Sequence, residues 1–577
     1  MNEYIIKNTF KIFSLKQKIN FILLVFLSFL SSIFEMIGIF LILPVTAILF
    51  DIQEATKYEN FYQFSVITQN YFGGNFKIIT IFILISVFTI KFVFLFFTNY
   101  LQVKFLNSIN ANLDQKILLE KLKSDFKNFN FFKIKNFTLP ILKETSFFAQ
   151  HVLRNMLIII ADLPLVIFFF IILYIENSFV FWIIIISFVI IIIIYLLIIR
   201  NKLNTYGSQR YKFEQSRLEV LTQIFNSIRD IKLYDKQKFF YNNYKKVSGR
   251  YFKALTAILT LSFLPKLFLE YFFILLISLL IIFFLTTTSG NLVNSVHFFA
   301  FLVVAVSRLA PIFNRLVGAV QQIKFFMPSS KYVINIAKKN IFLESNNPKK
   351  NFSFKKEINL KNFSFKYTDQ NNYVFKKLNF KIKKNKITGI VVESGSGKST
   401  LINIISGLIY NKGNNLFVDK TAVNKNNVEN LYSKFAIISQ NSNLIHGTLK
   451  SNIAFGENGN NLDLKKIIKI SKQAGIHNFI SKLPKKYETI LSEKISNISG
   501  GQKQRIEIAR ALYFDREILV LDESTSALDN LNEQIVIKTL KKLSSNKTII
   551  FISHDRKRLD FCDHIYKILN YKVDLLK

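Results

Sequence analysis

The sequence predicts a two-part chain: an α-helical membrane domain with six spans, followed by an α/β domain built around a phosphate-binding loop. Long apolar runs dominate residues 1 to about 330, and each is near or above the roughly 20 residues that cross a bilayer. Beyond them, the glycine-rich segment Ser394 to Thr400 follows an apolar strand pattern and opens a helix pattern. A second apolar strand pattern, Ile518 to Leu521, ends in Asp522 and Glu523.

The composition supports a polytopic membrane protein. At 577 residues the chain exceeds one ordinary domain, and a 50% hydrophobic content with 63 Phe is too apolar for a uniformly soluble protein. The net charge of +39 would suit a nucleic-acid partner, but the Lys and Arg residues are scattered and no base-stacking module accompanies them. We therefore expect no nucleic-acid binding. The single cysteine, Cys562, excludes an intramolecular disulfide and a cysteine-based metal cluster.

The charge of the loops predicts the topology of the membrane domain. The six predicted spans are about 19–49, 76–98, 153–175, 179–199, 255–285 and 296–320. The long segments 99–150 and 200–254 are rich in Lys and Arg, whereas 176–179 and 286–297 contain neither. The positive-inside rule places both long loops and both chain ends in the cytoplasm. The first apolar run is too long for a cleaved leader, so we expect it to be retained.

Ionisable side chains inside the apolar runs are candidates for a substrate path, because each costs about 3 kcal/mol or more at the bilayer centre. They are Glu35, Lys91, Asp162, Glu270, Arg308 and Arg315. Each could instead form a structural pair or extend to the lipid headgroups. Arg308 and Arg315 share one helical face on either side of Pro311. Two guanidinium groups there could bind a phosphate or pyrophosphate bidentately.

The phosphate-binding loop predicts a nucleotide site with magnesium. Backbone N–H groups of the loop and of the following helix would surround the phosphates, Lys398 would reach the β and γ groups, and Ser399 would offer its hydroxyl to Mg²⁺. The predicted nucleotide-binding residues here are Ser394, Gly395, Ser396, Gly397, Lys398, Ser399 and Thr400.

One residue departs from the phosphate-loop pattern, because Val392 stands where the pattern has its first glycine. A β-branched residue tolerates unusual backbone angles poorly. We therefore expect a strained or shifted start of the loop and weaker nucleotide binding. A catalytically degenerate domain is the alternative interpretation.

The segment Ile498-Ser499-Gly500-Gly501-Gln502 lies between the two strand motifs, and with them the second domain resembles the ATP-binding cassette of ABC transporters. Together with the membrane half, the chain resembles an ABC exporter half-transporter. The resemblance implies ATP and Mg²⁺ as cofactors and an ATP hydrolase coupled to transport. It implies that Tyr367 stacks on adenine, that Asp522 and Gln440 serve the metal, and that Glu523, His554 and Gln440 serve catalysis. It also implies that Ser499, Gly500, Gly501 and Gln502 close over the nucleotide of a facing cassette.

The resemblance also sets the expected domains and partner. Residues 1–330 form the transmembrane domain, 331–357 a polar linker and 358–577 the cassette. Because one cassette needs the signature segment of another, the chain should pair with a second copy of itself. A different half-transporter is the alternative partner.

A narrower resemblance concerns the substrate. The run Ser307 to Arg315, with Phe34-Glu35 and Leu43-Pro44, is similar to bacterial flippases of lipid-linked oligosaccharides. It implies a polyprenyl-pyrophosphate glycolipid bound by Arg308, Arg315 and Glu35, and a place in the bacterial inner membrane with a cytoplasmic cassette. The alternatives are export of another lipid, a peptide or a drug, or a membrane ATPase that does not transport.

Overall fold

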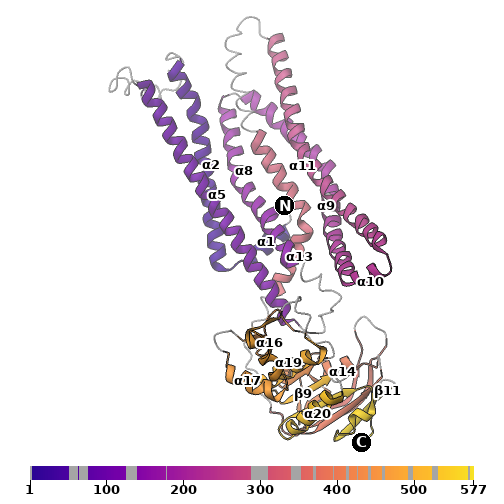
Figure 1. The fold of residues 1–577 in the computed structure, drawn as a ribbon. Coiled ribbons are helices and arrows are strands. Elements are labelled where there is room, and N and C mark those ends of the chain that lie inside the picture. Colours follow the sequence, from indigo (N-terminus) through magenta and orange to yellow (C-terminus); the bar gives the residue numbers. More distant parts are fainter. Residues whose placement is uncertain are drawn as a thin grey trace. The chain divides into compact units, whose positions relative to one another are not determined.

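The computed structural model describes most of the chain and divides it into two compact units (Figure 1). Unit 1 is Met1–Ser124 with Asn130–Ser345, and unit 2 is Asp125–Phe129 with Asn346–Lys577. The described residues are 3–50, 63, 76–124, 126, 140–176, 178–287, 310–339, 353–367, 372–393, 396–410, 415–424, 427–439, 444–457, 462–491, 498–522, 530–569 and 572–577.

Unit 1 is helical over nearly all of its described residues. Its elements are α1 (Glu3–Ile12), α2 (Leu15–Phe50), α5 (Phe76–Lys123), the π-helical turns η4 (Pro140–Glu144) and η5 (Phe148–Leu153) with α7 (Thr145–Phe147) between them, α8 (Arg154–Glu176), α9 (Ser178–Asn226), α10 (Ile228–Leu233), α11 (Gln237–Thr287) and α13 (Met327–Lys339). Residues 310–325 are also helical.

Four helical stretches among the described residues are long and apolar enough to cross a membrane: Leu15–Ile37, Ile81–Lys123, Ile141–Ile171 and Gln237–Phe272. They overlap four of the six predicted spans. The predicted span 179–199 lies within the helix α9. Of the predicted span 296–320, residues 310–320 are helical and the rest lies outside the described residues.

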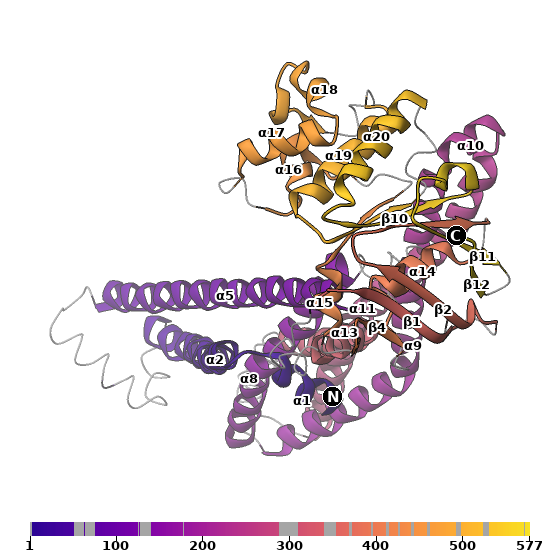
Figure 2. The ribbon, with the colours of Figure 1, turned by 90° about the horizontal axis from the view of Figure 1, so that it is seen from below.

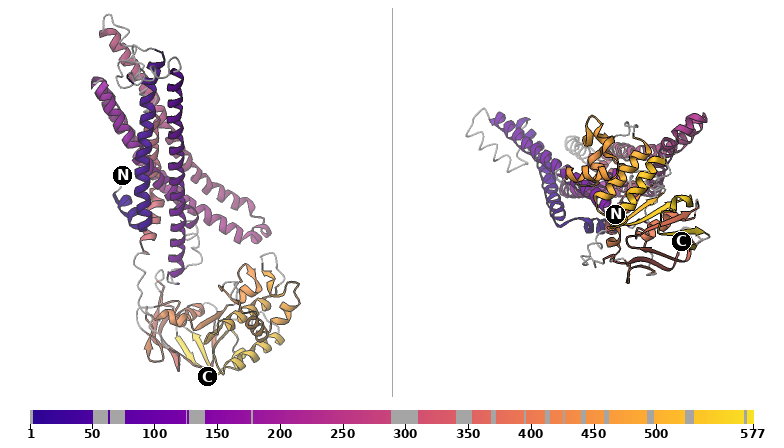
Figure 3. Two further views of the ribbon diagram at one scale, coloured as in Figure 1. Left: turned by 90° about the vertical axis from the view of Figure 1, so that its left-hand side faces the viewer. Right: turned by 60° about the horizontal axis from the view of Figure 1, so that its bottom comes forward.

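The long helices continue well past the predicted spans. In α5 the apolar run ends near residue 98, yet the helix extends to Lys123. Phe105, Ile109, Leu113 and Ile117 are all buried there and follow one another at intervals of four residues. That interval keeps one face of a helix apolar, so packing maintains the helix beyond the membrane. In the same way α9 and α11 run side by side to the short helix α10 at their tip (Figures 1 and 3).

A buried charge holds three segments of unit 1 together. Arg210 of α9 is 1% exposed, and its guanidinium contacts the carboxylate of Glu144 in η4 at 3.2 Å and the hydroxyl of Ser329 in α13 at 2.5 Å. It also lies over the rings of Phe147 and Phe326. Residues 331–339, the first part of the predicted linker, thus belong to α13, where Val333 and Ile334 are fully buried.

The described residues of unit 2 form three sheets with helices around them. Its strands are β1 (Glu357–Phe365), β2 (Phe375–Lys383), β3 (Ile387–Val392), β4 (Leu416–Val418), β5 (Thr421–Ala422), β6 (Phe435–Ile438), β7 (Gly447–Thr448), β8 (Ile490–Leu491), β9 (Ile518–Asp522), β10 (Thr548–Ser553), β11 (His564–Leu569) and β12 (Lys572–Leu575). Its helices are α14 (Lys398–Ile405), α15 (Val428–Tyr432), α16 (Leu449–Ile453), α17 (Leu464–Gln473), α18 (His477–Ser481), α19 (Gly500–Tyr513) and α20 (Asn530–Leu543), with the 3₁₀ turns η8 (Lys486–Glu488) and η9 (Arg556–Leu559).

The central sheet of unit 2 has the strand order β12-β11-β3-β10-β9-β6, and all neighbours are parallel except β12 and β11. Successive residues of its strands enter two different hydrophobic clusters: Ile549 and Phe551 of β10 enter one, Ile550 and Ile552 the other. This alternation buries both faces of the sheet. Figure 2 shows α16 to α20 on one side of β10 and the strands β1 and β2 on the other.

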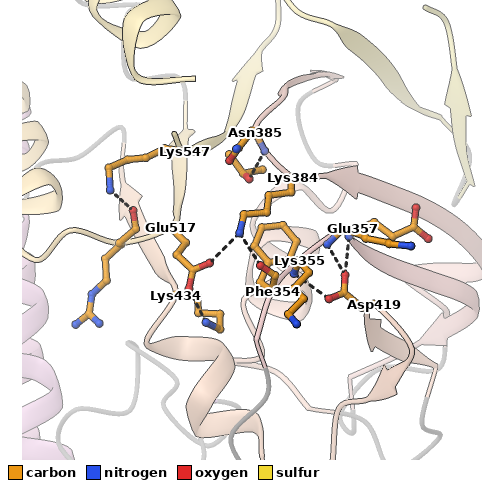
Figure 4. Close-up of polar contacts among 12 residues, drawn as sticks. Phe354, Lys355, Glu357, Lys384, Asn385, Asp419, Lys434, Glu517 and Lys547 are labelled. Atoms are coloured by element: carbon orange, nitrogen blue, oxygen red, sulfur yellow. Dashed lines mark hydrogen bonds and ion pairs between the residues drawn. The ribbon is translucent and has the colours of Figure 1, made fainter. Parts of the chain in front are cut away.

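The second sheet, β2-β1-β4-β5, is antiparallel, and a carboxylate fixes the start of β1 (Figure 4). Asp419 accepts hydrogen bonds from the backbone N–H groups of Lys355, Lys356 and Glu357 at 2.7–2.8 Å. Burial alone would raise the pKa of Asp419, but these three hydrogen bonds outweigh it and hold the pKa below its usual value. The chain therefore reaches β1 in a fixed position.

Candidate functional site

The phosphate-binding loop lies between the buried strand β3 and the helix α14, as the sequence predicts. Gly397 precedes α14 with φ of 94°, a left-handed conformation that favours glycine. A Cβ atom at this position would lie 2.9 Å from Val374 and 3.1 Å from Phe375. The left-handed backbone therefore favours glycine here, and a Cβ would force the neighbouring side chains to shift. The amino end of α14 therefore follows the phosphate-binding loop directly, and its partial positive charge favours binding of a phosphate there.

Two predicted site residues meet at the carboxyl edge of the central sheet. The ammonium group of Lys398, the first residue of α14, lies 3.2 Å from the carboxylate of Asp522, the last residue of β9. Both side chains are largely buried. The hydroxyl of Ser396, two residues before Lys398, is buried and has no hydrogen-bond partner among the described residues. A cation, a carboxylate and an unused hydroxyl suit a phosphate group with its metal ion.

The oxygen donors at this edge fit magnesium. Mg²⁺ prefers carboxylate, hydroxyl, phosphate and water oxygens, and it is seldom held by the protein alone. Asp522 and the exposed Ser399 offer two such oxygens. No group of three or more His, Cys, Asp or Glu side chains gathers anywhere in the described residues. A metal ion here would therefore depend on the phosphates of a bound nucleotide for most of its ligands.

Val392 occupies its position without the strain that the sequence suggests. It is the last residue of β3, pairs with Ile568 of β11, and does not have a positive φ. Its side chain is 2% exposed and belongs to the cluster that contains β1 and β2. The glycine of the usual pattern is therefore replaced here by a core residue of a regular strand, and Val392 itself has ordinary strand geometry. Ser394 and Gly395 of the loop lie outside the described residues.

The carbonyl of Val392 also holds the predicted catalytic residue His554. His554 follows β10, which lies next to β3 in the sheet, and its Nδ1 donates a hydrogen bond to the Val392 carbonyl. A carbonyl oxygen can only accept, so the proton of this contact is on Nδ1. The contact therefore connects the start of the phosphate-binding loop directly to His554.

Tyr367 lies beside the same helix. Its hydroxyl shares a hydrogen bond of 3.0 Å with Thr400 of α14, and its ring packs edge-to-face on Phe365 at 5.0 Å. The side chain is half-buried at the end of β1. The structure thus brings Tyr367, Thr400 and the phosphate-binding loop into one neighbourhood.

The signature segment forms the amino end of α19. Ser499 is the N-cap of that helix: its hydroxyl accepts from the backbone N–H of Gln502, and the Gln502 side chain accepts from the backbone N–H of Ser499. This reciprocal pair is a capping box, and the Ser-x-x-Gln spacing would have predicted it. Gly500 and Gly501 occupy the first turn. Both polar side chains of the motif therefore position the helix end before any ligand is bound.

Several predicted site residues lie outside the described residues: Arg308, Ser394, Gly395, Gln440 and Glu523. Glu523 directly follows Asp522, the last residue of β9. Gln440 is separated from the end of β6 by Ser439 alone. The strands that lead to both residues are neighbours in the central sheet.

In unit 1, Arg315, one of the predicted substrate-binding residues, forms an ion pair with another charged residue. Arg315 contacts Asp162 of α8 through two hydrogen bonds, Nε to Oδ2 at 2.9 Å and Nη2 to Oδ1 at 3.1 Å. Two of the ionisable residues from the predicted spans therefore form an ion pair between α8 and the helical residues 310–325.

Sequence reasoning missed the buried pair of Arg210 and Glu144. Both residues lie in long basic loops, where most charged side chains are solvated. A signal was present in Gly207, three residues before Arg210. A Cβ atom on Gly207 would lie 2.2 Å from the carbonyl oxygen of Phe325, so only glycine allows the two chain segments to approach this closely.

Comparisons with known proteins agree with this site. Residues 375–526 match the family model described as ABC transporter. The chain is 40% identical over 188 residues to "Multidrug resistance protein 1" of Entamoeba histolytica, covering 32% of this chain and 14% of that protein. It is 35% identical over 205 residues to an "ATP-dependent lipid A-core flippase" of Saccharophagus degradans, covering 36% of this chain and 35% of that protein. The chain thus spans about a third or less of these curated relatives.

The likeness to a solved structure extends over the whole chain. A bacterial Atm1-family ABC exporter with ATP bound aligns with a TM-score of 0.77 at 18% identity, covering 97% of this chain and 94% of that one. The predicted fold class, an ABC exporter membrane domain with an α/β cassette, is confirmed. The family match also agrees with the predicted ABC-type ATP hydrolase.

Proposed function

We propose that this chain, which carries an ABC transporter cassette and has the fold of an ABC exporter, is an ATP-hydrolysing half-transporter. The observation that carries the proposal is the meeting of Lys398 and Asp522 at the sheet edge, next to the left-handed glycine Gly397 of the phosphate-binding loop. A membrane unit with long apolar helices precedes this site. The cassette would lie on the cytoplasmic side of a bacterial inner membrane.

Each residue of the site has a chemical task in ATP hydrolysis. Lys398 would bind the β and γ phosphates in place of Asp522, and Tyr367 would stack on the adenine. Ser399, Asp522 and Gln440 would hold Mg²⁺, which would supply charge neutralisation at the phosphate oxygens. Glu523 accepts a proton from the attacking water, while His554, held by Val392, contacts the γ-phosphate.

The functional form would be a homodimer. The amino end of α19, with Ser499, Gly500, Gly501 and Gln502, is suited to approach a phosphate of a second cassette. The tip between α9 and α11 leaves Phe225, Leu233, Tyr234 and Phe239 largely exposed. Apolar side chains gathered on an exposed tip favour a partner surface. A second copy of the chain supplies every motif that two equivalent ATP sites require.

The substrate would be an amphiphile with an anionic headgroup, most specifically a lipid-linked oligosaccharide with a pyrophosphate. Arg308, Arg315 and Glu35 are the proposed contacts in the membrane. Export of another lipid or a drug is the second candidate, favoured by the names of the two relatives above.

The test is the ATPase activity of the purified full-length dimer in phosphatidylcholine nanodiscs, with and without undecaprenyl-pyrophosphate oligosaccharide. Glu523→Gln provides the blank. Stimulation by this lipid above the blank is the expected result. ATPase activity above the blank that this lipid does not change would support the ATPase and contradict the proposed substrate. Wild-type activity equal to the blank would overturn the whole proposal.

A further inference from the structure

Tyr367 lies just past the end of a strand, and two side chains hold it there. The strand β1 ends at Phe365, and Tyr367 is half-buried two residues later. Its ring contacts that of Phe365 edge-to-face, with the ring centroids 5.0 Å apart. Its hydroxyl lies within hydrogen-bond distance of the Thr400 hydroxyl, at 3.0 Å. The position of the tyrosine ring therefore depends on one contact with its own strand and one contact with α14.

Thr400 can fix this ring because its own position is fixed. It is the third residue of α14 and is 8% exposed. A β-branched side chain in a helix has few accessible rotamers. A buried hydroxyl also needs a hydrogen-bond partner, and Tyr367 supplies one. The bond thus connects the tyrosine ring to the helix whose first turn follows the phosphate-binding loop.

A second contact joins the same elements. The backbone N–H of Val374 donates to the carbonyl of Phe365 at 2.8 Å, which connects the start of β2 to the end of β1. Val374 also lies against the loop, because a Cβ atom on Gly397 would be 2.9 Å from its side chain. Gly397 and Thr400 are three residues apart, less than one turn of helix. The β1–β2 end therefore packs on the start of α14 at two neighbouring positions.

We infer that Thr400 is a positioning residue for Tyr367, because its hydroxyl orders the tyrosine ring before a nucleotide binds. Ordering one such side chain during binding lowers affinity about threefold to tenfold, and a ring ordered in advance avoids this loss. The nucleoside part of a ligand benefits from the bond, whereas a phosphate group without a base does not. The inference rests on the proposed function, since it requires that Tyr367 stacks on adenine.

The experiment measures what the nucleoside adds to affinity. ADP is titrated calorimetrically, alone and in competition with inorganic pyrophosphate, with Mg²⁺ present and the full-length protein in phosphatidylcholine nanodiscs. The readout is the dissociation constant of pyrophosphate divided by that of ADP. Any effect that Thr400 has on the phosphates themselves changes both constants and largely cancels in this ratio, which isolates its effect on the nucleoside.

Thr400→Val removes the hydroxyl at nearly constant shape, so the ratio should fall about threefold to tenfold. Tyr367→Phe removes the other hydroxyl and preserves the ring, so it should lower the ratio equally. The double variant should fall no further, because both substitutions break the same bond. Thr400→Ser retains a hydroxyl and should retain the wild-type ratio. Thr388→Val is the matched control, since Thr388 is fully buried in β3 and its hydroxyl has no hydrogen-bond partner among the described residues.

The outcomes separate the inference from the proposed function. If Tyr367→Ala leaves the ratio unchanged, the proposed stacking is wrong and the inference is lost with it. If Tyr367→Ala lowers the ratio while Thr400→Val and Tyr367→Phe both retain it, the stacking stands and the positioning role is wrong. Additive effects in the double variant would also overturn the inference, because the two hydroxyls would then act separately. Should Thr400→Val fail to fold, Tyr367→Phe tests the same bond from its other end.

Discussion

Val392 stands where a phosphate-binding loop usually begins with glycine, yet its backbone is an ordinary part of β3 and its side chain is buried. The sequence alone identified the departure but not its consequence. The conformation of a loop start depends on how the strand before it pairs, and that pairing involves β11, far along the chain. The structure therefore gives this residue a role in packing the cassette core.

Val392→Gly should accordingly lower the stability of the cassette and leave ATP affinity nearly unchanged. Removing the side chain leaves a cavity and a flexible strand residue, a loss of about 2–4 kcal/mol. The backbone carbonyl that holds His554 remains. Chemical unfolding and ATP-binding titrations on the same preparation would test this. Tighter ATP binding without loss of stability would instead mean that valine strains the loop.

At the scale of elements, the motifs that fill one strand–loop–helix unit were predictable, because their residues are neighbours in sequence and their geometry is local. Gly397 before α14 and Asp522 at the end of β9 are examples. The extensions of α5 and α9 beyond the membrane were not predicted in full. The buried apolar residues of these extensions are interspersed with many charged residues. Hydropathy averaged over a window of sequence is therefore low there, although one face of the helix is apolar.

The start of α19 allows the structural and functional roles of the signature segment to be separated. Ser499→Ala removes the N-cap and should lower stability by about 1 kcal/mol. Gln502→Glu preserves the capping box, since Glu serves at this position as well as Gln. It adds a negative charge where a partner's phosphate is proposed to bind.

We therefore expect Gln502→Glu to unfold like wild type and to lose at least about tenfold in ATPase activity, the effect of roughly 1.4 kcal/mol of like-charge repulsion. Thermal unfolding and steady-state ATPase assays measure the two effects. Equal activity in Gln502→Glu and wild type would argue against a phosphate near this helix end.

For the whole molecule, the least predictable features are pairs of residues far apart in the sequence. Asp162 with Arg315 and Glu144 with Arg210 depend on which helices pack together and in which rotation, and one sequence does not contain that information. Each of these residues was visible only as a charge in a span or in a basic loop. The same holds for Lys398 and Asp522, although there the resemblance to ABC cassettes implied that both serve one nucleotide.

Arg210→Met tests how far the buried pair stabilises unit 1 as a whole. The variant leaves the carboxylate of Glu144, which is fully buried, without its cation, and removal of one partner of a buried pair typically loses about 3–5 kcal/mol. Adding Glu144→Leu replaces both charges by apolar groups and should recover most of the loss. Lys212→Met, at an exposed position on the same helix, should have little effect.

The chain carries a natural reporter for each unit in this experiment. Its single tryptophan, Trp182, lies in α9, and its single cysteine, Cys562, is buried in the cassette, where burial raises the thiol pKa to about 12. The thiol should therefore resist labelling until the cassette unfolds. Arg210→Met should shift the tryptophan transition to lower temperature and leave the cysteine-labelling transition in place. If both transitions moved together, the two units would unfold as one, and the buried pair would stabilise the entire chain rather than unit 1.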